Sequence, residues 1–159
     1  QYPTENDLEV FYGKDKVDIL KINSKYYSTY IPTSWKIHQA VDSMFIIIDT
    51  MDNRGDNIII SVMEDSCNLK KIAKNKIREL EENDYEFENS KSEFFKKEGK
   101  DYLLHSLSLS VNNITYDQIC YHTCQNQNSR ISCCLTTTPK DSLNKQVILD
   151  FVASKMVFK

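Results

Sequence analysis

Glycine and proline are scarce in this sequence, with three residues of each. Three glycines argue against the glycine-rich loops that cradle phosphate groups, so we expect no nucleotide-binding loop of that kind. The scarcity of both residues favours long strands and helices joined by polar turns. The longest apolar run, residues 44–48, is far shorter than the ~20 residues that span a bilayer. We therefore expect a soluble protein with no membrane span.

A strong charge of either sign is also missing. The formal net charge is −3, and acidic and basic residues are interspersed along the chain. Nucleic-acid-binding domains usually concentrate Lys and Arg on one face, so we expect no nucleic-acid partner. No repeat or linker divides the sequence. We expect residues 1–159 to form a single domain, with residues 1–15 as a flexible N-terminal segment.

Apolar periodicity predicts the order of the secondary structure. Strands are expected at 26–31, 45–49, 57–63, 85–91, 93–97, 102–111, 114–124 and 130–137. Leu69, Ile72, Ala73, Ile77 and Leu80 share one face of a 3.6-residue period and predict a helix over 69–82. A second helix follows Asp141. Because strands adjacent in sequence outnumber helices, the fold class is α+β, with an antiparallel sheet of about six strands.

Five cysteines are present, so at least one is unpaired within a monomer. A turn centred on residues 126–127 places Cys120 opposite Cys133 on paired strands, where a disulfide fits. Zinc is the alternative, with Cys120-x3-Cys124 and Cys133-Cys134 as ligands. Adjacent residues of a strand point to opposite faces, which disfavours that set. A disulfide between Cys120 and Cys133 is one interpretation, and ordinary free thiols in the core or at the surface are the other. We expect no metal.

No catalytic constellation emerges from the remaining polar residues. His105 lies on the apolar face of its strand and is expected in the core, and His122 lies between Cys120 and Cys124. The acidic residues near 79–88 fit a solvated helix end, and Asp49, Asp52 and Asp56 fit the chemistry of a hairpin turn. We predict no catalytic residue and no cofactor.

An aromatic group precedes the first predicted turn. Tyr26, Tyr27, Tyr30 and Trp35 are residue types that dominate binding interfaces, and they form a candidate interaction surface. The other interpretation is that alternate members of this group lie in the core. Both interpretations remain open at the level of the sequence.

The tyrosine-rich strand that ends in Ile31-Pro32-Thr33-Ser34-Trp35 resembles the opening of PsbP-like domains. The order of the following strands, the helix at 69–82 and the closing helix also resemble that superfamily, over residues 26–159. Its members include photosystem extrinsic subunits, DcrB-like lipoproteins and type VI secretion adaptors, which are mostly non-enzymatic. The resemblance implies an αβα sandwich and a binding role, and it supplies no catalytic residue.

These observations favour a bacterial binding domain of adaptor or immunity type, whose partner is another protein. The start at Gln1 fits either a removed signal peptide or a trimmed chain. We expect a periplasmic or secreted protein, with a cytoplasmic location as the alternative. Two other functions remain open. One is a small-ligand or metal-ion-binding domain, and the other is a hydrolase with a spatially assembled site.

Overall fold

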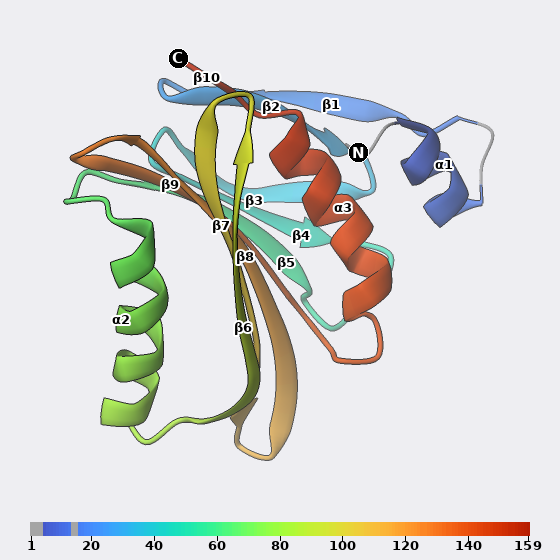
Figure 1. Ribbon diagram of the computed structural model, residues 1–159. Coiled ribbons are helices and arrows are strands. Elements are labelled where there is room, and N and C mark those ends of the chain that lie inside the picture. Colours follow the sequence, from blue (N-terminus) through green and yellow to red (C-terminus); the bar gives the residue numbers. More distant parts are fainter. Residues whose placement is uncertain (1–4, 14–15) are drawn as a thin grey trace.

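The computed structural model describes residues 5–13 and 16–159. The described part contains three helices, α1 (Glu5–Tyr12), α2 (Leu69–Glu82) and α3 (Ser142–Ser154). Its strands are β1 (Ile19–Asn23), β2 (Tyr27–Pro32), β3 (Trp35–Val41), β4 (Met44–Asp49), β5 (Asn57–Met63), β6 (Glu86–Lys97), β7 (Lys100–Val111), β8 (Ile114–Asn126), β9 (Ser129–Thr137) and β10 (Val157–Phe158). Figure 1 shows their arrangement.

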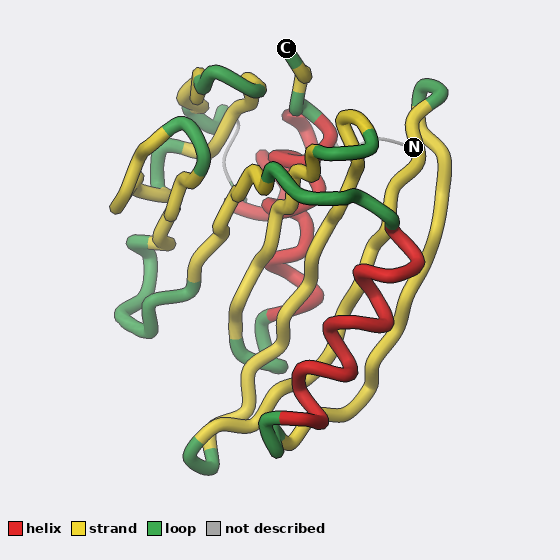
Figure 2. The backbone as a smooth tube through the Cα atoms, turned by 90° about the vertical axis from the view of Figure 1, so that its left-hand side faces the viewer, coloured by secondary structure: helices red, strands yellow, loops and turns green. Residues whose placement is uncertain are grey.

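The strands form two antiparallel sheets. The large sheet has seven strands in the order β3-β4-β5-β9-β8-β7-β6, and the small one has the order β1-β2-β10. Helix α2 lies on one side of the large sheet, and α3 lies on the other side with the small sheet above it (Figures 1 and 2). We call the face toward α3 the inner face and the face toward α2 the outer face. The predicted α+β class with antiparallel pairing is confirmed.

The inner face of the large sheet carries most of the core. The register places Ile47 opposite Ile58, and Ile58 opposite Leu135, so these buried side chains form one row across three strands. Burial of such a side chain contributes about 1.5–3 kcal/mol to folding. The small sheet closes the core from above, where the ring centroids of Tyr27 and Phe45 lie 6.1 Å apart.

The helix predicted at 69–82 and the hairpin of β4 and β5 are confirmed. Asn68 caps the N-terminus of α2, because its side-chain oxygen accepts a hydrogen bond from the backbone N–H of Lys71 at 3.2 Å. The sheet is larger than expected, with seven strands. The strands expected at 85–91 and 93–97 are one strand, β6, with an irregularity between Glu88 and Lys91. Pro32 is the last residue of β2, and a new strand, β3, starts at Trp35.

Part of the N-terminal segment that we expected to be flexible, residues 1–15, forms the helix α1. Leu8 is fully buried in the core, and Phe11 and Tyr12 pack against it. The phenol oxygen of Tyr12 accepts hydrogen bonds from Ser34 and from the indole N–H of Trp35, both at 3.0 Å. Residues 1–4 and 14–15 lie outside the described part of the chain. Leu8, Phe11 and Tyr12 anchor this segment, although most of its other residues are polar.

A buried ammonium group connects α3 to the loop between β4 and β5. Lys145 is 7% exposed, and its Nζ lies 2.9 Å from Asp49, 2.6 Å from Asp52 and 2.5 Å from Asp56. Burial alone would lower the pKa of Lys145, but the hydrogen bonds to the three carboxylates outweigh it and raise that pKa. Arg54 adds ion pairs to Asp52, Asp56 and Asp141. The carboxylates that the sequence assigned to turn chemistry therefore also hold α3 in place.

Replacement of Lys145 with Met should leave three carboxylates close together without their central cation. Loss of one partner of a buried ion pair typically costs about 3–5 kcal/mol, so we expect Lys145→Met to lower the free energy of unfolding by about that amount. Urea denaturation at neutral pH measures it. Lys140→Met is the matched control at an exposed position, and equal stability of the two variants would contradict the interpretation.

Candidate functional site

A polar cavity of about 460 Å³ lies between α2 and the outer face of the large sheet. The sheet contributes polar side chains from β7, β8 and β9, which are unusual on a sheet face that a helix covers. These are His105, Gln118, Cys120, His122, Ser132 and Cys134. Helix α2 contributes polar side chains to the opposite wall, including Lys76 and Glu79. Alternation along β8 and β9 sends Ile119, Cys133 and Leu135 to the core and these polar side chains into the cavity, whereas on β7 the apolar Leu107 shares the cavity face with His105.

Helix α2 rests lightly on the sheet. Leu80 is its one buried residue, although the helix has 14 residues. A disulfide between Cys67 and Cys124 fixes the chain just before the helix, with a Cα–Cα distance of 5.7 Å. The backbone N–H of Cys67 also donates to the carbonyl of Gln127 at 2.8 Å. Covalent attachment at one end therefore compensates for the sparse apolar packing of α2.

The register of β8 and β9 corrects the predicted disulfide. Cys120 lies opposite Cys134, and these two form the disulfide, with a Cα–Cα distance of 4.1 Å. Cys133 is a free, buried thiol on the inner face. The predicted pairing of Cys120 with Cys133 is wrong because the turn is placed one residue further along and the strand bulges at Gln125. A one-residue shift moves every side chain of a strand to the other face.

His122 is held in place by its neighbour on β9. Its Nδ1 lies 2.6 Å from the hydroxyl oxygen of Ser132, which is its cross-strand partner. Burial, with the nearby charge of Arg130, lowers the pKa of His122 to about 3, so the imidazole is neutral at physiological pH. His105 lies opposite Cys120 on β7, and its Nε2 lies 3.2 Å from the hydroxyl of Ser90. Burial also lowers the pKa of His105.

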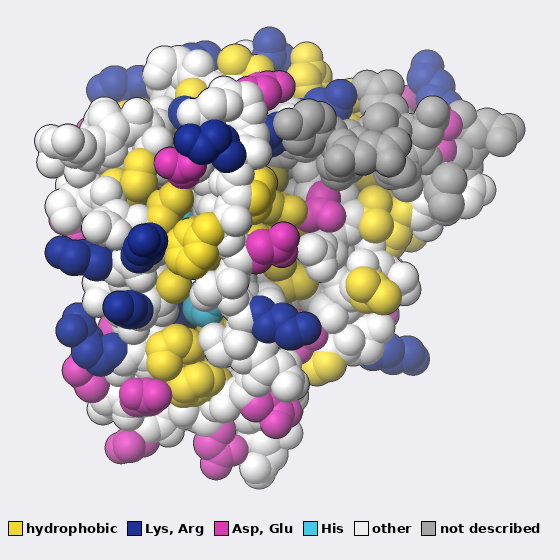
Figure 3. Space-filling model, in the orientation of Figure 1, with side chains coloured by type: hydrophobic (Ala, Val, Ile, Leu, Met, Phe, Trp, Pro, Cys, Tyr) yellow, Lys and Arg dark blue, Asp and Glu magenta, His cyan; other side chains and the backbone are white. Residues whose placement is uncertain are grey.

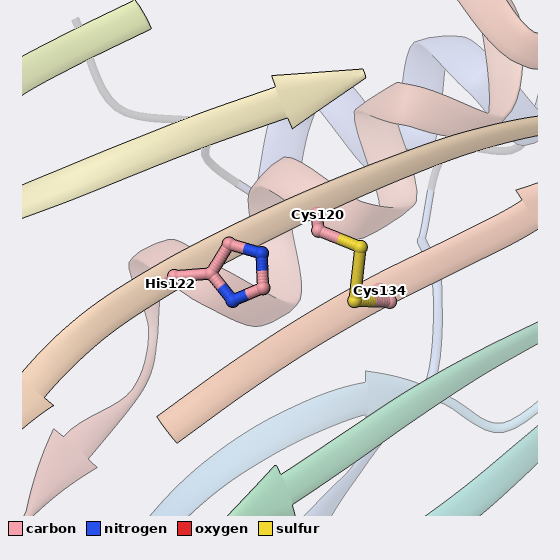
Figure 4. A group of neighbouring side chains, drawn as sticks. All are labelled: Cys120, His122 and Cys134. Atoms are coloured by element: carbon pink, nitrogen blue, oxygen red, sulfur yellow. A yellow bond between two sulfur atoms is a disulfide. The ribbon is translucent and has the colours of Figure 1, made fainter. Parts of the chain in front are cut away.

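Cys120, His122 and Cys134 each place one potential ligand atom within 4.8 Å of the others. Figure 4 shows the imidazole of His122 beside the disulfide, with one ring nitrogen directed toward the two sulfur atoms. The four cysteines considered as a zinc set do not come together in this way, because Cys124 is bonded to Cys67 and Cys133 faces the core. The alternation of Cys120 and His122 along β8 was the signal in the sequence for this group.

The predicted aromatic interaction surface is wrong for two of its four members. Tyr27 and Trp35 are 0% and 2% exposed, so they belong to the core. Tyr26 and Tyr30 are half-buried and pack against it. Alternation along β2 separates buried Tyr27 from half-buried Tyr30, as the second interpretation of the sequence expected.

This three-layer α+β chain is similar to several solved structures. Cyanobacterial PsbP (CyanoP) from Synechocystis has a TM-score of 0.68 and 14% identity, over 90% of this chain and 94% of that chain. LpqN, which is involved in cell envelope biogenesis of Mycobacterium tuberculosis, has a TM-score of 0.60 and 8% identity, over 96% of each chain. A Pseudomonas aeruginosa protein of unknown function has a TM-score of 0.54 and 15% identity, over 80% of this chain and 88% of that chain.

The chain therefore has the PsbP-like fold, and the resemblance in the sequence is confirmed at that level. No protein-family model matches the sequence. No curated protein matches it significantly either. Among the described residues, no helix is both long enough and apolar enough to cross a membrane.

The disulfide pattern predicts one reactive thiol in the unfolded, non-reduced chain. Alkylation in denaturant without reductant should modify Cys133 alone, since the other four cysteines are bonded. Digestion and fragment mass spectrometry should then show Cys67 linked to Cys124 and Cys120 linked to Cys134. Five alkylated cysteines, or a Cys120–Cys133 linkage, would contradict this arrangement.

The depressed pKa of His122 predicts a loss of stability in acid. Below about pH 6.5, His122 takes up a proton in the unfolded chain. In the folded chain the imidazole stays unprotonated down to about pH 3. The free energy of unfolding should therefore fall with decreasing pH in this window, by about 2–3 kcal/mol between pH 6.5 and 4.5. Urea denaturation across this range should show a shallower loss for His122→Gln. His38→Gln, at an exposed position on β3, should follow the unmodified chain; identical slopes for all three proteins would refute the assignment.

Proposed function

We propose that this chain is a non-enzymatic binding domain of an exported bacterial protein, and that its partner is another protein. Residues 1–159 act as a single domain in this proposal. The adaptor or immunity type of function expected from the sequence remains part of it. The observation that carries the proposal is an apolar surface on the outer face of the large sheet.

Helix α2 covers only one half of this outer face. It packs on β6, β7 and β8, and Figure 2 shows the strands of the other half without a helix in front of them. The register places six apolar side chains of β3, β4 and β5 on this uncovered half, which we call the open face. Its members are Val41, Met44, Ile46, Ile48, Ile59 and Met63.

Two members of the open face are well exposed, Val41 at 51% and Met63 at 42%. Contiguous apolar surface of this kind is rare on monomeric proteins and marks interaction sites. The charged side chains at the outer-face strand positions around it are Lys36 and Arg130, and no carboxylate occupies such a position on β3, β4, β5 or β9. A partner that presents an apolar centre with an acidic rim fits this surface, because complementary charge selects the partner and speeds its encounter.

The comparisons support a role in the cell envelope without identifying a partner. One similar structure is described as involved in cell envelope biogenesis, and the fold is shared over almost the whole of both chains. A disulfide-linked chain fits an oxidising compartment, which in a bacterium is the periplasm or the exterior. A cytoplasmic location is the alternative, and it would require that both disulfides be reduced.

A small-ligand or metal-ion-binding domain is the second candidate function. The cavity under α2 favours it, because histidine and cysteine side chains converge on its floor. The space-filling view of Figure 3 shows a histidine between apolar side chains on the visible face, with Lys and Arg gathered along the edge that α2 forms. This cavity lies next to the open face, so one chain can bind both a protein partner and a small ligand or metal ion.

Photo-crosslinking from the open face tests the proposal. A benzoylphenylalanine at position 59 should capture one partner in an envelope extract of the source bacterium, and the same group at Lys74 on the exposed side of α2 should not. The partner, once purified, should bind at least tenfold more weakly to Val41→Asp/Met63→Asp, because each carboxylate then needs desolvation within an apolar contact.

Leu143→Asp is the matched control, since Leu143 is 80% exposed and lies on α3, on the opposite side of the large sheet from the open face. It should bind like the unmodified chain, and thermal unfolding should confirm that the variants are folded. Equal affinity of both variants would overturn the assignment of the open face. Concentration-dependent dimers in sedimentation that the double substitution abolishes would instead assign this surface to a second copy of the chain.

A further inference from the structure

The floor of the α2 cavity contains a ligand set that neither the fold nor the open face explains. Two sulfur atoms and one imidazole nitrogen gather there from β8 and β9, with all three atoms within 4.8 Å of one another. Ligands about 2.0–2.3 Å from one zinc ion lie roughly 3.3–3.8 Å apart in a tetrahedral site. Shifts of about 1 Å in the positions of the ligand atoms therefore suffice to place Cys120, His122 and Cys134 around one ion.

We infer that Cys120, Cys134 and His122 bind one zinc ion when the disulfide between the two cysteines is reduced. Thiolate sulfur and neutral imidazole are the ligands that zinc prefers in proteins. The fourth position of the site faces the polar cavity, where a water molecule completes the coordination. The three ligands come from β8 and β9, whereas the open face belongs to β3, β4 and β5.

The strands hold the three ligands in place before the ion arrives. Cys120 and Cys134 are directly opposite in the ladder of β8 and β9, and His122 is two residues beyond Cys120 on the same face. The hydrogen bond between His122 Nδ1 and Ser132 fixes the ring, which leaves Nε2 on the side of the sulfur atoms (Figure 4). A partner of this kind on the second ring nitrogen is typical of histidines that bind metal.

The disulfide and the metal exclude each other. A dithiol reductant donates two electrons and two protons to the Cys120–Cys134 bond, which becomes two thiols while the reductant becomes a disulfide. Zinc then displaces both thiol protons and binds the two thiolates. A disulfide oxidant reverses the sequence: it takes two electrons from the two thiolates and two protons from solvent and becomes a dithiol, while the two sulfur atoms bond again and the Zn²⁺ ion leaves. The cavity is thus a metal site that the thiol–disulfide balance opens and closes.

Metal titration of the whole chain tests this inference. After anaerobic reduction and removal of the reductant, Co²⁺ should produce thiolate-to-cobalt charge-transfer absorption with one ion per chain, and Zn²⁺ should displace it. Cys134→Ser and His122→Gln should each weaken zinc binding at least tenfold. Cys133→Ser is the matched control, because Cys133 is adjacent to Cys134 but points into the core.

The disulfide-intact chain should bind neither ion. Absence of binding by the reduced chain while circular dichroism shows it folded would overturn the inference. So would equal binding after replacement of His122 or Cys134, or an equally large loss with Cys133→Ser.

A second variant covers the case in which reduction unfolds the chain through loss of the Cys67–Cys124 bond. Cys134→His cannot form the second disulfide, keeps Cys67 bonded to Cys124, and offers the ion one thiolate and two imidazoles. It should bind Zn²⁺ without reductant, and the added substitution His122→Gln should weaken that binding at least tenfold. Binding that is unaffected by His122→Gln, or no binding at all, would reject the site.

Discussion

The pairing of β8 with β9 is the constraint on which the other features of this protein depend. One extra residue at Gln125 sets the register, so that Cys134 faces α2 and Cys133 faces the core. The same register aligns Leu135 with Ile119 on the inner face and His122 with Ser132 on the outer face. A one-residue slip of β9 would turn Cys134 into the apolar core and carry Cys133 and the core residues of β9 to the outer face. The dry core and the polar cavity are therefore two results of one alignment.

The large sheet is asymmetric because α2 is too short and too polar to cover its outer face. Its apolar stripe rests on β6, β7 and β8, and a disulfide rather than a wide contact secures its N-terminal end. Space remains beneath the helix for polar side chains, and the strands beyond it keep an apolar surface that none of the described elements covers. One short helix thus leaves both a cavity and a surface available for binding. On the inner face, α3 and the small sheet cover the core, and a smaller cavity of about 370 Å³ remains beside the N-terminal end of α3.

The sequence predicted the parts of this structure that depend on local periodicity. The bounds of α2 and the β4–β5 hairpin followed from the spacing of apolar residues, which is a property of the chain itself. Local patterns could not supply the contacts that join distant segments. Leu8 gave no periodic signal, yet it anchors α1 in the core, and Lys145 was not linked to the aspartates of a loop almost a hundred residues earlier. In the candidate site, the sequence suggested a disulfide at Cys120. Its partner depends on the bulge at Gln125, which no sequence motif predicts.

The disulfide between Cys67 and Cys124 has a consequence for how the chain reaches this topology. Strands β5 and β9 lie side by side at the centre of the sheet, although the meander of α2, β6, β7 and β8 separates them in sequence. Their closest pair along the chain is Met63 with Arg130. Cys67 follows Met63 by four residues, and Cys124 precedes Arg130 by six. Through the disulfide, a long-range pairing becomes a short-range one, and the entropic cost of closing that loop falls by roughly 1–2 kcal/mol. Oxidative folding should therefore proceed by a shorter route than folding of the reduced chain, because the covalent bond brings the two central strands together before the sheet is complete.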